Sequence, residues 1–164
     1  RFAKPRSHIA FSDHALIAPY QDKTALMFRI ASYKDNHNLS DAEIKVNLAL
    51  QVQEDGNATY KFYSLALERS KVDTLMMNWT VVHPIDEKSP LLGLTEEDYR
   101  SSDVEVYVNI KGFDDVYSTV VIQRTSYTYE EIIFNAKFMT MYRESDDGKT
   151  TILELDKLSR YNTL

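Results

Sequence analysis

The chain has 164 residues, of which 43% are hydrophobic and 27% charged, a composition typical of one folded globular domain rather than of a disordered segment. It contains no cysteine, which excludes disulfides, thiol nucleophiles and cysteine-ligated zinc or iron–sulfur centres. The formal net charge of −6 disfavours general nucleic-acid binding, and the four glycines lie in no glycine-rich phosphate-binding pattern.

The first twelve residues carry the basic side chains Arg1, Lys4 and Arg6 and no acidic residue. Such a cluster is either a solvated tail or a segment near an anionic membrane surface, where each basic side chain gains about 1 kcal/mol. No apolar run reaches the roughly 18 residues that cross a bilayer, and no signal peptide is expected. Because the chain begins with Arg1 rather than Met, we expect it to be a processed or excised portion of a longer protein.

Alternation of apolar and polar residues with a period of two dominates the chain and predicts β-strands. The clearest cases are residues 44–52 and 104–110, in which Val, Ile and Leu occupy every second position. Other stretches rich in Val, Ile, Thr, Tyr and Phe predict further strands. In chain order the predicted strands are Thr24–Ile30, Ile44–Val52, Thr59–Leu67, Asn78–Val82, Val104–Ile110, Tyr117–Tyr127, Ile132–Tyr142 and Thr151–Leu155.

Asp-Gly pairs within Glu54–Asn57 and Asp146–Lys149 predict tight hairpin turns, because glycine accepts a positive φ angle. Helical signals are few. Thr95–Asp98 matches a capping box and predicts the start of a short helix, and Leu155–Tyr161 predicts a second one. Many short strands at regular spacing, with one or two short helices, predict an all-β antiparallel sandwich.

Side chains that carry chemistry do not gather into a catalytic pattern. The acid clusters at 96–98 and 130–131 are typical of helix starts and solvated surfaces. We therefore expect no catalytic residue, no metal site and no cofactor. A β-sandwich glycosidase, which needs two opposed carboxylates, is the enzyme alternative. Four histidines have no metal-ligand spacing and are expected to be structural: His8, His14, His37 and His83.

The segment Trp79–Leu91 is unusual, because a predicted strand runs into two prolines six residues apart. Pro84 and Pro90 fix φ and are expected to end regular strand pairing. Asp86 and Ser89 are residue types that hydrogen-bond the backbone in turns. The pattern predicts a rigid loop after the strand.

The sequence HPIDEKSPL at His83–Leu91, followed by the acidic short helix at Thr95–Asp98, resembles the cytoplasmic domain of inward-rectifier potassium channels. Other landmarks agree with that family in order. Phe11–Ile17 resembles its first strand, and LMFRI at Leu26–Ile30 resembles its L-M-x-R strand. An acidic-Ala pair, an R-x-S-Y segment and a following E-I pair lie at Asp41–Ala42, Arg124–Tyr127 and Glu131–Ile132.

The resemblance implies an immunoglobulin-like β-sandwich that assembles as a homotetramer around a water-filled axis and extends a membrane pore into the cytoplasm. The whole protein would be a voltage-gated, inward-rectifier potassium channel, with K⁺ passing along the axis. Two transmembrane helices and a selectivity-filter loop are expected upstream of Arg1. This chain would be the soluble portion on the cytoplasmic side of the membrane, with a basic membrane-proximal linker and first strand start at 1–12 and the sandwich at 13–164.

Lipid contacts follow from the same resemblance. Arg1, Lys4 and Arg6 match a basic linker that binds anionic lipid headgroups. Lys34, in the loop from residue 31 to residue 39, matches another basic position that takes part in gating. Regulation by anionic lipid is therefore expected.

Pore-lining or gating roles are implied for six residues: Asp41, Lys111, Gly112, Phe113, Asp114 and Asp115. Four copies of Asp41 around an axis would concentrate K⁺, Mg²⁺ and polyamines through a focused negative potential. Gly112 is expected to supply a backbone geometry that other residues cannot adopt. Lys111 stands where strong rectifiers carry an acid, so a ring of four cations predicts weak voltage-dependent block by polyamines.

The main alternative is a soluble immunoglobulin-like module that binds a ligand or a partner. That function predicts a monomer with an exposed apolar or aromatic patch. The channel function predicts oligomerisation and binding to anionic lipid that weakens with salt.

Overall fold

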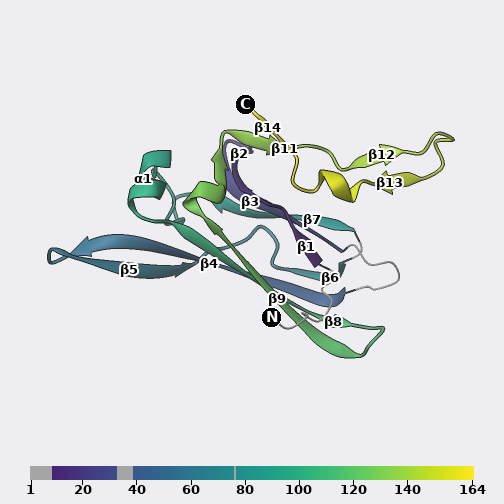
Figure 1. The fold of residues 1–164 in the computed structure, drawn as a ribbon, viewed down its shortest axis with the longest axis horizontal. Coiled ribbons are helices and arrows are strands. Elements are labelled where there is room, and N and C mark those ends of the chain that lie inside the picture. Colours follow the sequence, from purple (N-terminus) through teal and green to yellow (C-terminus); the bar gives the residue numbers. More distant parts are fainter. Residues whose placement is uncertain (1–8, 33–38, 76) are drawn as a thin grey trace, which may run out of the picture.

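The computed structural model describes residues 9–32, 39–75 and 77–164, which form two five-stranded sheets, two separate strand pairs and three short helices (Figure 1). The first sheet contains β1 (Ile9–Phe11), β2 (Ala15–Tyr20), β3 (Lys23–Ser32), β7 (Asn78–Ile85) and β10 (Ile132–Phe134). The second contains β4 (Leu39–Glu54), β5 (Asn57–Ser64), β6 (Lys71–Leu75), β8 (Glu105–Asp114) and β9 (Thr119–Thr128). The two pairs join β11 (Ala136–Phe138) to β14 (Tyr161–Thr163) and β12 (Tyr142–Glu144) to β13 (Thr151–Leu153).

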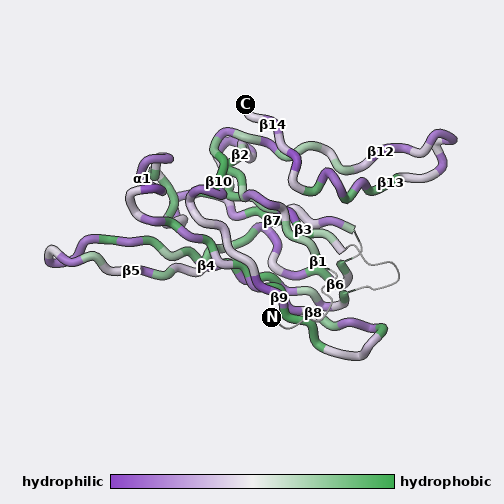
Figure 2. Tube along the Cα trace, in the orientation of Figure 1, coloured by the Kyte–Doolittle hydropathy of each residue, from purple (hydrophilic) through white to green (hydrophobic). Residues whose placement is uncertain are grey.

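The two sheets bury one apolar core between them, which confirms the predicted all-β sandwich. β3 pairs with β7 on one edge and with β1 and β2 on the other, and β4 pairs with β8 on one edge and with β5 and β6 on the other. Val106, Val108 and Ile110 of β8 are buried, as the alternation predicts. The turns at the ends of the β4–β5 and β12–β13 hairpins are hydrophilic (Figure 2).

Residues 11–17, expected to form one strand, are divided between β1 and β2. The Ser12 hydroxyl accepts a hydrogen bond from the backbone N–H of Arg29 (3.0 Å) and donates to the carbonyl of His14 (2.9 Å). The Tyr127 hydroxyl donates to the Ser12 carbonyl (2.8 Å). These side-chain bonds replace ladder hydrogen bonds, so the chain turns between the two strands.

Residues 132–142, also expected to form one strand, contain β10, β11 and the first residue of β12. Asn135, between β10 and β11, has a φ of 53°, a left-handed conformation that interrupts a strand. β10 pairs with β2 in parallel, so the sandwich is not antiparallel throughout. The parallel pair is possible because no hairpin joins β10 to β2: β10 follows β9 of the opposite sheet after three residues.

β7 continues through Pro84 to Ile85, which corrects the expectation that this proline ends strand pairing. Pro84 lies opposite Ala25 of β3. Among the described strands β7 pairs with β3 alone, and on such an edge a missing N–H removes no ladder bond. β6 escaped the sequence-based prediction because only Val72 and Leu75 of its five residues are apolar.

The predicted short helix at Thr95–Asp98 is α1 (Glu96–Ser101). The Thr95 hydroxyl accepts from the Asp98 N–H (3.1 Å), and the Asp98 carboxylate accepts from the Thr95 N–H (2.8 Å), so the predicted capping box is confirmed. The other helices are 3₁₀ turns, η1 (Tyr129–Glu131) and η2 (Leu155–Lys157), and η2 replaces the longer helix expected at 155–161. Over the described ranges, every helix is too short or too polar to cross a bilayer.

Both predicted Asp-Gly turns are confirmed. Asp55 and Gly56 have φ angles of 51° and 77° and form the two-residue loop between β4 and β5. Gly148, with a φ of 70°, lies in the loop between β12 and β13. The two glycines adopt left-handed backbone conformations, which would be strained for a residue with a side chain at the same position.

Residues 136–164, which we call the C-terminal strap, fold back against the first sheet (Figure 1). The strap contains β11, β12, β13, η2 and β14. It packs on β1 and β3 through a small apolar cluster that is separate from the main core. The cluster consists of Ala10, Ala31, Met141, Leu153 and Leu158.

Candidate functional site

β4 and β8 bring two predicted pore residues, Asp41 and Lys111, to one place. In the antiparallel register Ser40 lies opposite Phe113 and Glu43 lies opposite Lys111, so β4 holds one extra residue between these two pairs. The extra residue makes a β-bulge, in which Asp41 has a φ of 50°. Asp tolerates this left-handed conformation better than most residues.

A hollow of about 410 Å³ lies beside the bulge, between β4, β6, β8 and β9. We call it the β4–β8 hollow. Four of the six residues predicted to line or gate a pore contribute to its wall: Asp41, Lys111, Gly112 and Phe113. The prediction missed five further lining residues: Glu43, Lys71, Val72, Asp73 and Val120. Val120 could have been found by pairing the two predicted strands that became β8 and β9, because it lies opposite Phe113. The lining residues of β6 could not, because the sequence gives no clear strand signal there.

The charged side chains of the hollow are partly paired. Lys71 Nζ lies 3.3 Å from Glu43 Oε2. Within the described ranges, Asp41, Asp73 and Lys111 have no ion-pair partner. The hollow therefore combines three carboxylates with two ammonium groups, and its net charge is negative. No group of three or more His, Asp or Glu side chains among the described residues is arranged to hold a metal ion.

Gly112 is required for a reason other than the predicted one. Its φ is not positive, so its backbone conformation is open to other residues. A Cβ atom at this position would lie 2.4 Å from Cγ of Leu39, a buried side chain of β4. The absence of a side chain at Gly112 therefore lets Leu39 pack against β8.

The last two predicted pore residues form the base of the β8–β9 turn. Asp114 is buried, and its Oδ1 accepts hydrogen bonds from the N–H groups of Val116 (2.9 Å) and Tyr117 (3.2 Å). Asp115 Oδ2 accepts from the Ser40 hydroxyl at 2.5 Å. Neither residue lines the hollow; Asp114 orders the turn, and Asp115 ties the turn to β4. The predicted lipid contacts Arg1, Lys4, Arg6 and Lys34 lie outside the described residues.

The outward face of the second sheet carries a row of exposed apolar side chains. Residues 107, 111 and 113 of β8 are an even number apart and share this face, as do their cross-strand neighbours on β9. Phe62 joins the same face through the pairs Phe62–Ala49 and Ala49–Glu105. We call this surface the outer apolar face, and it consists of Tyr60, Phe62, Tyr107, Phe113, Val120 and Ile122.

A smaller hollow of about 230 Å³ lies at the β5 end of the outer apolar face. Rings of Tyr60, Phe62 and Tyr107 line it together with the carboxylates of Asp103 and Glu105. The Tyr60 hydroxyl donates to Asp103 Oδ2 (2.6 Å), and this bond to an acceptor carboxylate raises the pKa of Tyr60. The rings remain open to solvent, with Phe62 70% exposed.

Comparisons with known proteins agree with the resemblance. The family model described as "Inward rectifier potassium channel C-terminal domain" matches residues 9–162. The chain is 30% identical over 155 residues to the inward rectifier potassium channel Kirbac3.1 of Paramagnetospirillum magnetotacticum, which covers 93% of this chain and 52% of that protein. It is 29% identical over 140 residues to G protein-activated inward rectifier potassium channel 1 of Bos taurus, covering 79% of this chain and 27% of that protein.

The chain thus spans about half the length of the bacterial relative and about a quarter of the bovine one. Both are ion channels and not enzymes. A solved structure of the sporulation control protein Spo0M from Bacillus subtilis superposes with a TM-score of 0.36 at 8% identity, covering 76% of this chain and 48% of that one. That likeness is too low to carry any statement about this chain.

Proposed function

The chain belongs to the inward rectifier potassium channel C-terminal domain family, and on this premise we propose that it forms the cytoplasmic, ion-conducting and gating part of a tetrameric potassium channel. Four copies would surround a water-filled axis that continues the membrane pore. The observation that carries this proposal is the β4–β8 hollow, where Asp41 and the Lys111–Phe113 segment of another strand share one wall.

The outer apolar face supports self-association as the means of assembly. Its side chains are costly to leave in water, with Val120 55% and Ile122 52% exposed. The face adjoins the hollow, because Phe113 and Val120 belong to both. A second copy packed on this face would therefore bring the two hollows towards a common axis.

Charge near such an axis would act on the permeating ion. Asp41 is exposed, and carboxylates outnumber ammonium groups in each hollow. Four negative hollows around one axis would focus a negative potential, which concentrates K⁺ and other cations. Mg²⁺ and polyamines would enter the same field.

Lys111 is expected to limit block by polyamines, because its exposed ammonium group has no ion-pair partner among the described residues. In patch recordings of the full-length channel with cytoplasmic spermine, we expect weak voltage-dependent block. The variant Lys111→Glu replaces four positive charges with four negative ones and should strengthen the block at least about tenfold.

Lys88→Glu is the matched control, because it makes the same charge change in an exposed turn after β7. Its spermine block should equal that of the wild type. Strong block of the wild-type channel, or equal block in both variants, would contradict a pore-facing Lys111.

Anionic lipid is the proposed regulator, on the strength of the basic side chains Arg1, Lys4 and Arg6. Each should contribute about 1 kcal/mol near an anionic surface, so the triple variant R1Q/K4Q/R6Q should bind vesicles about 100-fold more weakly. Sedimentation with vesicles containing phosphatidylserine measures this. Binding should weaken with salt and be absent with neutral phosphatidylcholine vesicles. Equal binding by wild type and triple variant would exclude these residues as the lipid contact.

A further inference from the structure

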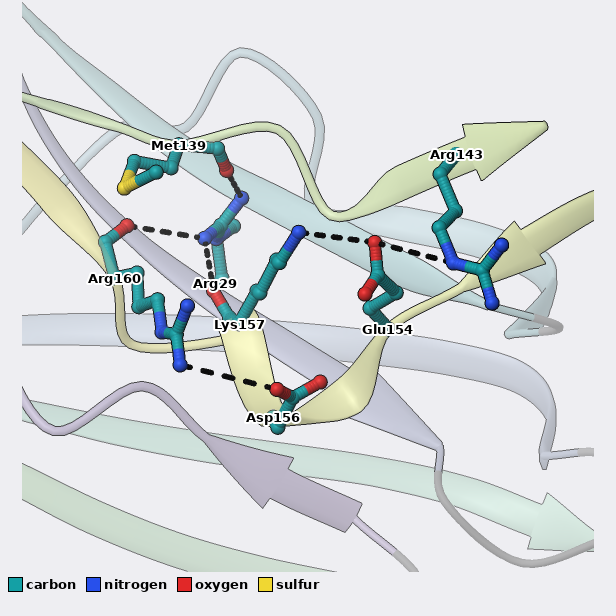
Figure 3. Close-up of polar contacts among 7 residues, drawn as sticks. All are labelled: Arg29, Met139, Arg143, Glu154, Asp156, Lys157 and Arg160. Atoms are coloured by element: carbon teal, nitrogen blue, oxygen red, sulfur yellow. Dashed lines mark hydrogen bonds and ion pairs between the residues drawn. The ribbon is translucent and has the colours of Figure 1, made fainter.

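Arg29 of β3 is a buried cation, 4% exposed, and no carboxylate lies within ion-pair distance of it in the described ranges. Its guanidinium donates instead to backbone carbonyls (Figure 3). Nε donates to Leu158 (3.0 Å), Nη1 to Met139 (2.6 Å) and Nη2 to Lys157 (2.8 Å), with a longer contact from Nη2 to the Arg160 carbonyl (3.4 Å). Every one of these acceptors belongs to the C-terminal strap.

The planar guanidinium suits this role because it presents several N–H groups in a fixed fork. Its carbon Cζ also lies 4.4 Å from the centre of the Phe138 ring, so the face of this aromatic ring, which belongs to the strap, covers the charge. Burial lowers the pKa of Arg29, but an arginine side chain stays protonated. The charge is thus compensated by strap groups while the strap is docked, and by water when it is not.

Two carboxylates of the strap form ion pairs within the strap itself. Glu154 Oε1 lies 3.0 Å from Lys157 Nζ and 3.8 Å from Arg143 Nε, and Asp156 Oδ2 lies 3.9 Å from Arg160 Nη2 (Figure 3). A backbone bond from the Met139 N–H to the Arg160 carbonyl also joins its two ends, and the Leu164 N–H donates to the carbonyl of Asn135, the residue just before the strap. The strap is therefore a unit with its own internal bonds.

Beyond Arg29, the strap contacts β1, β2 and β7 of the first sheet and the residues next to β1. The Asp13 N–H donates to Ser159 Oγ (2.9 Å), and the Tyr142 hydroxyl donates to Asn78 Oδ1. The small apolar cluster places Met141 and Leu158 against Ala10 of β1. β1 has three residues and pairs with β3 alone among the described strands, so this cover adds to the packing of Ile9 in the main core and to the bond from Gln123 Nε2 to the Ile9 carbonyl (3.0 Å).

We propose that Arg29 is a positioning residue that fastens the C-terminal strap over β1, so that loss of its guanidinium lets the strap open separately from the sandwich and loosens β1. Residues 1–8, which hold the basic linker, lead directly into β1. Docking of the strap would therefore alter the response to anionic lipid, a consequence that rests on the proposed function.

Amide hydrogen exchange of the 164-residue chain tests the fastening without membrane, lipid or ion flux. In Arg29→Met, which keeps an apolar stem, exchange should rise at least about tenfold over residues 139–160 and in β1. Exchange in β8 should stay within about twofold of the wild type. Arg143→Met is the matched control, because it removes an arginine of the strap that is exposed and forms one long ion pair, and it should leave exchange unchanged.

Arg29→Lys separates charge from geometry. A single ammonium group cannot reach all of the carbonyls that lie around the edge of the planar guanidinium, so it should restore only part of the protection. Full protection in Arg29→Lys, or unchanged exchange in Arg29→Met, would overturn the proposal. Faster exchange throughout Arg29→Met, β8 included, would overturn it as well, because Arg29 would then support the whole fold.

The wild-type chain provides a second test that does not depend on a variant folding. At low urea concentrations, strap amides should exchange at least about tenfold faster than β8 amides. Equal rates would mean that the strap opens only with the whole domain, against the proposal.

In the full-length channel, Arg29→Met should shift the anionic-lipid fraction that gives half-maximal K⁺ flux by at least about threefold, with Arg143→Met unchanged. An unshifted fraction would remove the link to lipid. A wild-type protein without lipid-dependent flux would instead count against the proposed function, so the two failures are distinguishable.

Discussion

Gly112 and Arg29 show how single residues acquire roles that their own type does not reveal. Gly112 has no side chain and so leaves room for Leu39, whose Cγ would lie 2.4 Å from a Cβ at this position. Arg29 and Asp114 are buried charged residues, and the hydrogen bonds described for both go to backbone groups. Such residues fix loops and segments in place, because an unpaired buried charge is costly.

Gly112→Ala should lower the free energy of unfolding by about 1–3 kcal/mol, since a methyl group would overlap a buried side chain. Urea unfolding followed by Trp79 fluorescence measures the change. In a Leu39→Ala background, the same substitution should cost less than about 1 kcal/mol, because the space is then open. Equal costs in the two backgrounds would contradict a steric role for Gly112.

At the scale of elements, His83 joins strand β7 to the loop between β5 and β6 and to the loop that follows β7. Its Nδ1 lies 2.6 Å from the Ala66 carbonyl and its Nε2 lies 2.7 Å from the Ser89 hydroxyl. A carbonyl can only accept, so Nδ1 carries the proton and the neutral Nε2 accepts from Ser89. Ser89 Oγ in turn accepts from the Leu91 N–H (3.1 Å). The rigid loop predicted from the prolines is thus held by a histidine.

This arrangement predicts a loss of stability in mild acid. Burial lowers the pKa of His83 in the folded chain below its ordinary value of 6.5. The unfolded chain therefore takes up a proton first, and the free energy of unfolding should fall as pH drops below about 6.5, by at most about 1.4 kcal/mol per pH unit. Urea unfolding between about pH 7.5 and pH 5.5 measures the slope. His83→Gln, which does not titrate, should lack this component, and an identical slope in that variant would exclude His83 as its source.

At the scale of the whole molecule, the two sheets differ in how their outward faces are covered. The C-terminal strap packs on β1 and β3 of the first sheet, through its own apolar cluster and Arg29. The outer apolar face of the second sheet is open to solvent in the single chain. This asymmetry favours assembly through the second sheet, with the β4–β8 hollow next to the interface.

The double variant Val120→Glu and Ile122→Glu should weaken self-association at least about 100-fold, because it places two carboxylates per chain in an apolar contact. Sedimentation equilibrium over a range of concentrations should give a wild-type mass near four times 19.0 kDa and a mass near 19.0 kDa for the variant. Leu92→Glu, at a residue that is 53% exposed in the turn before α1, should behave as the wild type. A wild type that stays monomeric throughout would favour the soluble binding module.

Much of the fold could be predicted from local patterns. Alternation in residues 44–52 and 104–110 correctly located the centres of β4 and β8, and the Asp55–Gly56 and Thr95–Asp98 motifs correctly located a turn and a helix start. These signals work because they depend on neighbours within about four residues. The splits at Ser12 and Asn135 escaped prediction, because the Ser12 bonds come from Arg29 and Tyr127, distant in sequence.

The sequence by itself determined the sandwich class and the family, since composition, period and motif order are properties of the chain alone. The family resemblance also pointed to four residues that line the β4–β8 hollow, and their role in a pore stays a prediction. Tertiary structure decided the rest. Three features depend on which strand lies beside which: the bulge at Asp41, the packing of Leu39 over Gly112, and the hydrogen bonds from Arg29 to the strap carbonyls. Register and long-range packing arise from contacts between residues far apart in the chain, and no local pattern encodes them.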